Sequence, residues 1–137
     1  MIRYLLDTNI WILYLKGGHP MLRAKLEVTD RRDIVTCPVV WAELLYGARR
    51  YEKRGEREAK VEAALSALVC LPFDVTAARQ YARVRDDLES QGLIIGGNDL
   101  IIASIALAHG LTVVTHNSDE FGRVPGLAVE DWVVSAS

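Results

Sequence analysis

Short apolar runs alternate with amphipathic stretches along the whole chain. Apolar runs that predict buried strands occupy residues 2–6, 34–37, 71–73, 111–115 and 127–129. Between them, apolar residues recur at helical spacing, which predicts helices that begin near residues 10, 21, 38, 61, 75 and 99. Strands that alternate with helices are typical of a parallel sheet with helices on both faces. We therefore expect an α/β protein with a single domain over residues 1–137.

The sequence also indicates where two of these segments lie in the fold. Pro72 falls within the run 71–73 and cannot donate a backbone hydrogen bond, so we expect this run at an edge of the sheet. The helix from Asp99 to His109 is apolar all round, which predicts burial on most of its sides. Gly110 follows this helix and is expected to end it.

Composition and charge narrow the class of protein. Half of the residues are hydrophobic and a quarter are charged, which is an ordinary globular composition. No apolar stretch reaches the ~20 residues of a membrane span, and the first residues lack a signal-peptide cleavage site, so we expect a cytoplasmic protein without membrane contact. Cys37 and Cys70 border apolar runs and are both expected to be buried. The net charge of −2 argues against a nonspecific nucleic-acid binder, unless the acids gather in one pocket.

Four places carry a carboxylate that secondary structure alone does not require. Asp7 follows the first strand, Glu43 lies on the weaker face of its helix, Asp99 opens the most buried helix, and the pair Asp119-Glu120 follows a strand. Each has a simpler explanation as a helix cap or a turn residue. Asp7 and the 119–120 pair follow strands that a parallel sheet would align, so both are expected at the same carboxyl edge, where such sheets bind ligands.

Carboxylates that converge on one spot repel one another and raise their own pKa values, unless a cation lies among them. Oxygen ligands without histidine or thiolate favour Mg²⁺ or Mn²⁺ over zinc. Setting aside four acids at −1 each turns the formal net charge of −2 into +2 for the rest of the chain. The apparent acidity is thus that of the predicted site.

An ordered set of motifs resembles the PIN domain. It covers nearly the whole chain and consists of Asp7-Thr8-Asn9, Glu43-Leu44-Leu45-Tyr46-Gly47, Gly97-Asn98-Asp99 with Ile101-Ile102-Ala103, and Thr115-His116-Asn117 followed by Glu120-Phe121. The C-terminal stretch, residues 123–132, is similar to VapC-type toxins of bacterial type II toxin–antitoxin pairs. Any one motif is weak, but their order along the chain makes the resemblance specific.

The resemblance implies an α/β/α sandwich with a five-stranded parallel sheet. It also implies a Mg²⁺- or Mn²⁺-dependent endoribonuclease that hydrolyses RNA, often tRNA or other structured RNA, with Asp7, Glu43, Asp99 and Glu120 as catalytic and metal-binding acids. A cognate antitoxin, a homodimer, and contact with DNA only through the antitoxin are further implications. Asp119 competes with Glu120 as the fourth acid. We predict Glu120, because Phe121 should anchor the turn in the core and neighbouring side chains diverge.

Polar and basic residues near the acids are candidates for substrate contacts. Thr8, Asn9 and Asn117 can donate hydrogen bonds to ligands or phosphate, and His116 is the only histidine expected nearby. The charge-dense segment after the Glu43 helix is a candidate for gripping RNA phosphates, first through Arg49, Arg50 and Lys53 and further through Arg54, Arg57 and Lys60. The alternative is a solvated helix face. We see no aromatic platform for reading bases.

Other functional classes remain open from the sequence. A haloacid-dehalogenase-like phosphatase also places an Asp after its first strand, but it would carry a second Asp where this chain has Asn9. A non-enzymatic PIN-like interaction module would not need the intact acidic set. Within the nuclease class, an RNA-maturation enzyme is the alternative to a toxin.

Overall fold

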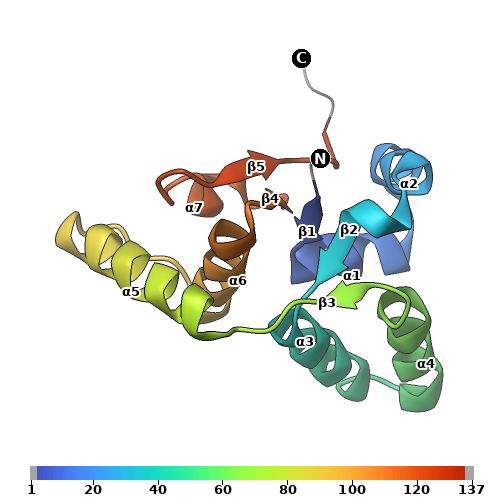
Figure 1. Ribbon diagram of the computed structural model, residues 1–137. Coiled ribbons are helices and arrows are strands. Elements are labelled where there is room, and N and C mark those ends of the chain that lie inside the picture. The colour runs from blue at the N-terminus through green and yellow to red at the C-terminus, as the bar shows by residue number, and fades with distance from the viewer. Residues whose placement is uncertain (1–2, 135–137) are drawn as a thin grey trace.

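The computed structural model describes residues 3–134, which fold around a five-stranded parallel sheet (Figure 1). The strands lie in the order β3-β2-β1-β4-β5. Their bounds are β1 Tyr4–Leu6, β2 Ile34–Thr36, β3 Val69–Cys70, β4 Thr112–Val114 and β5 Ala128–Glu130. All four strand pairs are parallel, so the predicted α/β/α fold with a five-stranded parallel sheet is confirmed.

Seven α-helices and one short 3₁₀ helix connect the strands in the described part of the chain. They are α1 Thr8–Lys16, α2 Pro20–Val28, η1 Arg31–Asp33, α3 Pro38–Arg49, α4 Arg54–Leu65, α5 Val75–Ser90, α6 Gly97–His109 and α7 Ser118–Phe121. Figure 1 shows α5, α6 and α7 on one side of the sheet and α1, α2 and α4 on the other. Over residues 3–134, no helix combines the length and the apolar character that crossing a membrane requires.

The strand order reverses beside β1, and this reversal locates the functional edge of the sheet. The chain moves outward from β1 to β2 and β3, then returns to the opposite side of β1 for β4 and β5. In open parallel sheets, ligands bind at the carboxyl ends of strands where the order reverses. Here that point lies between Leu6 of β1 and Val114 of β4, which pair with each other. Asp7 directly follows and donates its backbone N–H to the Val114 carbonyl oxygen at 3.0 Å.

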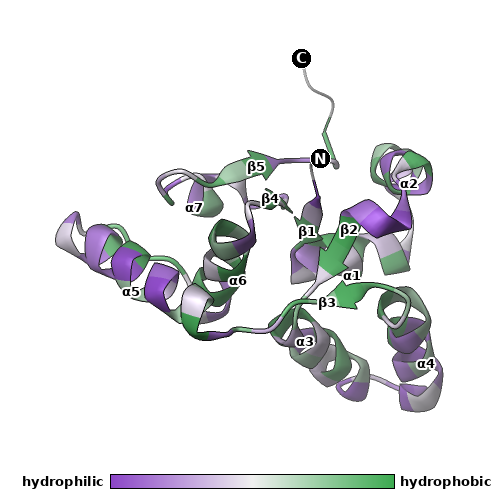
Figure 2. Ribbon diagram, in the orientation of Figure 1, coloured by the Kyte–Doolittle hydropathy of each residue, from purple (hydrophilic) through white to green (hydrophobic). Residues whose placement is uncertain are grey.

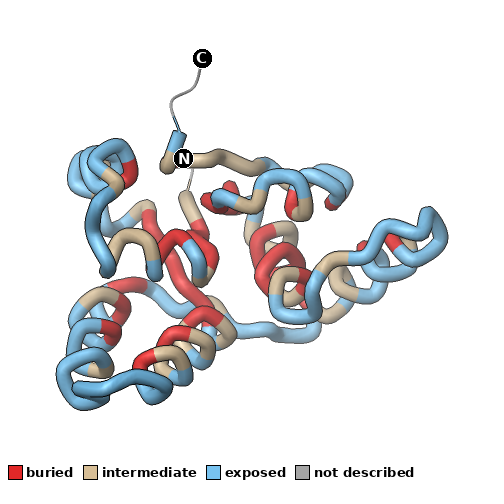
Figure 3. The backbone as a smooth tube through the Cα atoms, turned by 180° about the vertical axis from the view of Figure 1, so that it is seen from behind, coloured by how far each residue is buried: buried red, intermediate tan, exposed pale blue. Residues whose placement is uncertain are grey.

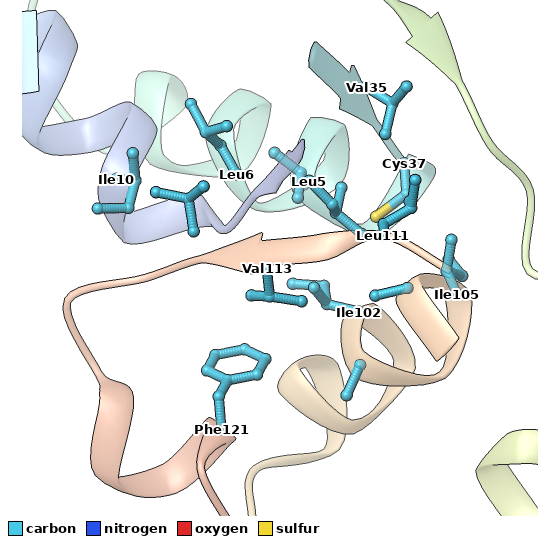
Figure 4. Close-up of a cluster of buried hydrophobic side chains, with 14 of the residues drawn as sticks. Leu5, Leu6, Ile10, Val35, Cys37, Ile102, Ile105, Leu111, Val113 and Phe121 are labelled. Carbon is cyan, nitrogen blue, oxygen red and sulfur yellow. The ribbon is translucent and has the colours of Figure 1, made fainter. Parts of the chain in front are cut away.

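The core lies between the central strands and α6 (Figure 4). Leu5, Val113, Ile102 and Phe121 are fully buried. Figures 2 and 3 show the same division along the chain: the central strands β1, β2 and β4 and much of α6 are apolar and buried, whereas the outer turns of α4 and α5 are polar and exposed. Burial of Phe121 confirms that this residue anchors the short α7 turn in the core.

Two predicted segments differ from the structure. The edge strand is Val69–Cys70 rather than residues 71–73, because Leu71 makes the last backbone bond to β2, to the Thr36 carbonyl oxygen at 2.8 Å, and Pro72 has no N–H to continue. Cys70 is therefore exposed at the sheet edge, and its predicted burial is wrong, whereas Cys37 is buried as predicted.

The helix expected to begin near residue 61 begins at Arg54 instead. Its first two turns lack an apolar stripe, and only Val61 and Leu65 are buried. Apart from Gly55, these turns consist of Arg, Glu, Ala and Lys residues, which are strong helix formers by intrinsic propensity. Elsewhere the agreement is close: α6 is mostly buried, and Gly110 ends it with a left-handed φ of 63°.

Candidate active site

Asp7 combines a structural and a chemical role at the end of β1. One carboxylate oxygen accepts a hydrogen bond from the Ile10 backbone N–H at 2.9 Å and so caps α1. The other accepts from the Thr115 hydroxyl at 2.5 Å. Burial raises the pKa of Asp7, and the nearby charges of Glu43 and Asp131 raise it further, against the lowering effect of the two hydrogen bonds. The Asp7 side chain therefore both caps α1 and contributes a carboxylate to the candidate site.

Glu43 reaches the same place from α3. Its carboxylate accepts a hydrogen bond from the Thr8 hydroxyl at 2.6 Å, across 35 residues of sequence. Thr8 is the residue after Asp7, so this bond ties α3 to the carboxyl end of β1. Because Glu43 is half-buried, its charge acts on Asp7 and Asp99 through protein as well as through water.

Asp99 lies in the first turn of α6, half-buried, with the other acids around it. Burial, followed in order of size by the charges of Glu120, Asp7 and Glu43, raises its pKa to about 6. Within residues 3–134 no hydrogen-bond donor reaches this carboxylate. Its position at the N-terminus of α6 favours the charged form, but burial and the neighbouring acids outweigh that effect.

Two hydrogen bonds hold the Glu120 carboxylate in place. One oxygen accepts from the Gly96 backbone N–H and the other from the Asn117 side-chain amide, both at 2.6 Å. These donors lower the pKa of Glu120. A Cβ added at Gly96 would lie 3.7 Å from a Glu120 oxygen and 3.9 Å from an Asp99 oxygen, which is ordinary van der Waals contact, so both carboxylates lie beside Gly96. Asp119 is exposed.

The chain is similar to known proteins over almost its whole length. The PIN domain family matches residues 4–127. The chain belongs to the PIN-domain family. It is 40% identical over 131 residues to Ribonuclease VapC2 of Rickettsia felis, a match that covers 94% of this chain and 97% of the relative. It is 34% identical over 132 residues to the tRNA(fMet)-specific endonuclease VapC of Shigella flexneri, with 96% and 99% covered.

A solved complex has the same fold as this PIN domain. The VapBC2 structure from Rickettsia felis, bound to a DNA fragment from its promoter, superposes with a TM-score of 0.85 and 39% sequence identity. The superposition covers 96% of this chain and 99% of the matched chain. With the family shown, the haloacid-dehalogenase-like phosphatase is no longer an alternative.

Some of the residues predicted to contact the substrate lie beside the four acids, whereas others do not. Thr8 and Asn117 donate hydrogen bonds to Glu43 and Glu120, so each orients a predicted catalytic acid. Asn9 is exposed and has no side-chain hydrogen bond within the described residues.

The three predicted basic contacts lie at the far end of α3 and beyond it. Arg49 pairs with Glu58 at 3.3 Å, and Arg50 donates to the Tyr46 hydroxyl at 2.6 Å. Lys53 precedes α4 with a left-handed φ of 61°. None of these three side chains contacts the four acids within the described residues, so an RNA chain would have to extend from the acids to reach them.

Sequence reasoning missed three supporting groups. Thr115 is fully buried and donates to Asp7, and its hydroxyl also accepts from the Asn117 backbone N–H at 2.9 Å. Gly96 supplies a backbone donor to Glu120. Asp131 acts on Asp7 through its charge and lies 2.9 Å from the Nδ1 atom of His116. Thr115 carried a usable signal, because it follows β4 at the edge where Asp7 follows β1.

The donor set fits a hard divalent cation by its chemistry. Four carboxylates with no histidine or thiolate among them form a typical Mg²⁺ or Mn²⁺ environment. Among residues 3–134, no three acidic or metal-binding side chains lie close enough to ligate one ion together. Asp7, Glu43 and Glu120 each accept hydrogen bonds from other groups of the chain. Mg²⁺ generally takes one or two carboxylates and retains several waters, and such coordination suits this arrangement.

Proposed function

We propose that this PIN-domain protein is a metal-dependent endoribonuclease and the toxin of a VapC-type toxin–antitoxin pair. One observation carries the proposal: four separate segments of the chain bring Asp7, Glu43, Asp99 and Glu120 together, so that the charges of the other three acids raise the pKa of Asp99. The names of the relatives, Ribonuclease VapC2 and an endonuclease VapC, support the same reaction. An intact acidic set would be superfluous in a non-enzymatic interaction module.

Asp7 and Asp99 are the proposed principal ligands of Mg²⁺ or Mn²⁺, and Glu43 and Glu120 complete the shell or a second site. When bound, the ion would stabilise negative charge on the phosphate and would lower the pKa of a water molecule. Ile10 N–H and Thr115 hold the Asp7 carboxylate in place, and Thr8 does so for Glu43. In the proposed hydrolysis the oxygen of a water molecule would bond to phosphorus and the P–O3′ bond would break, which leaves a 5′-phosphate and a 3′-hydroxyl without participation of the RNA 2′-hydroxyl.

The proposed substrate is a structured RNA, with tRNA first among the candidates. The name of the Shigella flexneri relative specifies tRNA(fMet), and that relative is 34% identical to this chain. Thr8, Asn9 and Asn117 are proposed hydrogen-bond donors near the cleaved bond, and Arg49, Arg50 and Lys53 are proposed contacts to phosphates farther along the RNA.

The proposed partner is an antitoxin that closes the acidic site. The matched chain of the Rickettsia felis VapBC2 complex shares the fold of this chain, and that complex is bound to a DNA fragment from its promoter. A segment with an arginine would suit clustered carboxylates, since guanidinium and carboxylate form strong bidentate hydrogen bonds. We propose that this protein meets DNA only through such a partner. A homodimer and a cytoplasmic location remain predictions.

Two experiments test the proposal. Purified protein should cleave tRNA with Mg²⁺ present, and Asp7→Asn or Asp99→Asn should abolish the cleavage while Asp119→Asn retains it. Expression of the wild-type protein alone should arrest growth, and expression of Asp99→Asn should not. RNA cleavage without growth arrest would favour an RNA-maturation enzyme instead of a toxin. Wild-type protein that cleaves no RNA would refute the nuclease assignment.

A further inference from the structure

Two exposed tyrosines each lie beneath an arginine guanidinium in the region from the end of α3 to the start of α4. The guanidinium carbon of Arg50 lies 5.6 Å from the centre of the Tyr46 ring, and its Nη1 donates to the Tyr46 hydroxyl at 2.6 Å. Arg57 lies over Tyr51 at 5.2 Å. Tyr46 is 60% exposed and Tyr51 is 64% exposed. Aromatic and basic side chains therefore interleave in this region, a feature that the sequence analysis did not recognise.

Tyr46 shares a helix face with one of the four acids. It follows Glu43 by three residues in α3, and side chains three apart lie on the same face with Cβ atoms about 5–6 Å apart. Gly47 adds no side chain that would cover this face, and Arg50 extends it by one more turn. Leu44 and Ala48, on the opposite face, are buried. A strip formed by Glu43, Tyr46 and Arg50 thus leads away from the acids along α3.

The charge of Arg50 is available at this strip. Its guanidinium has no carboxylate partner within 4.0 Å among residues 3–134, whereas the neighbouring Arg49 pairs with Glu58 at 3.3 Å. Arginine binds phosphate with planar, bidentate geometry and also stacks on aromatic rings. An exposed ring beside an arginine that lacks a carboxylate partner provides the two parts of a single-stranded nucleic-acid contact: a surface for a base and a cation for the backbone.

We infer that Tyr46, supported by Arg50, forms a stacking subsite for one unpaired base of the RNA next to the cleaved bond. This inference rests on the proposed function and adds a specificity determinant to it. Stacking on a ring tolerates any base, because every base has a π-face, so the subsite selects for unpaired RNA rather than for a sequence. The attraction also offsets the repulsion between RNA phosphates and the four acids.

A second tyrosine–arginine pair provides a matched control. Arg85 donates to the Tyr81 hydroxyl at 3.1 Å and lies 6.0 Å from its ring centre, with the same i, i+4 spacing as Tyr46 and Arg50. This pair lies on α5, on the other side of the sheet from α1 (Figure 1). Both side chains of this pair already have other partners: Tyr81 packs edge-on against Phe73, and Arg85 forms an ion pair with Glu89 at 2.9 Å.

The test measures binding of a fluorescently labelled single-stranded oligoadenylate to Asp99→Asn protein, so that cleavage does not interfere. Adding Tyr46→Ala should weaken binding about 5- to 10-fold, the lower range for loss of one base–aromatic stack. Tyr46→Phe keeps the ring and should bind within about 2-fold of the parent. Tyr81→Ala should bind like the parent. Replacement of one adenine by 2-aminopurine reports stacking directly, and its quenching should be lost only in Tyr46→Ala.

In the binding and light-scattering measurements, three results would overturn the inference: unchanged binding in Tyr46→Ala, equal losses in Tyr46→Ala and Tyr46→Phe, or a change of oligomeric state in Tyr46→Ala. The last result would mean that Tyr46 belongs to a protein interface. With the Asp99 side chain intact, cleavage by Tyr46→Ala should show a raised KM and a nearly unchanged kcat. If wild-type protein cleaves RNA but Tyr46→Ala has the same KM, the inference alone fails. If wild-type protein cleaves no RNA, the proposed function fails.

Discussion

Asp99→Asn should stabilise the metal-free protein at neutral pH, because Asp99 is ionised in a place that disfavours its charge. Burial, and then the charges of Glu120, Asp7 and Glu43, raise its pKa from 3.8 to about 6. At about 1.36 kcal/mol per pH unit, this difference corresponds to at most about 3 kcal/mol. Because Asp99 is only half-buried, water screens the effect, and we expect a gain of about 1 kcal/mol in the free energy of unfolding.

The pH dependence of this gain has a definite sign. The folded protein binds the Asp99 proton more tightly than the unfolded chain, so the contribution of Asp99 to stability falls as pH rises from 3.8 to about 6. Above that range the loss is complete and constant. Asp99→Asn has no such proton. Its advantage over wild type should therefore grow between these two pH values and then remain level.

Urea unfolding in EDTA at a series of pH values measures this difference, with the exposed Asp119→Asn as a control that should follow wild type. Mg²⁺ should reverse the order of stability, because an ion that binds only the folded wild-type protein stabilises it by mass action. A variant that is less stable than wild type at every pH would show that the main effect of the Asp99 carboxylate is to stabilise the N-terminus of α6. That result would refute the reasoning.

Three further changes test separate parts of the site. Glu120→Gln should weaken Mn²⁺ binding in calorimetry far more than Asp119→Asn does, and a larger loss for Asp119→Asn would mean that the wrong acid is assigned. Thr8→Val removes the donor to Glu43 and should slow RNA cleavage about 10-fold, as expected for loss of a hydrogen bond to a charged group; Thr8→Ser should retain the rate. Phe121→Ala should lower the free energy of unfolding by about 3 kcal/mol, whereas Phe73→Ala, at a ring that is 41% exposed, should cost much less in the same urea titration.

The fold was predictable from the sequence where burial leaves a pattern. The runs around Leu5, Val35 and Val113 are apolar because these strands are covered on both faces, and the structure buries all three residues completely. The edge strand left no such pattern. Val69 and Cys70 are exposed, so nothing in their hydropathy separates them from the neighbouring apolar residues that were assigned to the strand instead.

The acids of the candidate site were predictable, but the contacts that hold them were not. Asp7 and Asp99 stand out because each opens a helix at a strand or loop end. The bond from Thr115 to Asp7 spans 108 residues, and the bond from the Gly96 N–H to Glu120 spans 24. Such contacts depend on how strands and loops align in three dimensions, and no local pattern encodes them. The Tyr46 and Arg50 pair was missed for another reason, since its exposure only shows in the fold.

Analysis of the RNA ends after cleavage tests the central claim most directly. The claim is that the four acids serve a divalent ion and that water is the nucleophile. Cleavage with Mg²⁺ should give products with a 5′-phosphate and a 3′-hydroxyl, as read by ligation and by phosphatase treatment, and EDTA should abolish the reaction. Products that end in a 2′,3′-cyclic phosphate, or cleavage that persists in EDTA, would contradict the account.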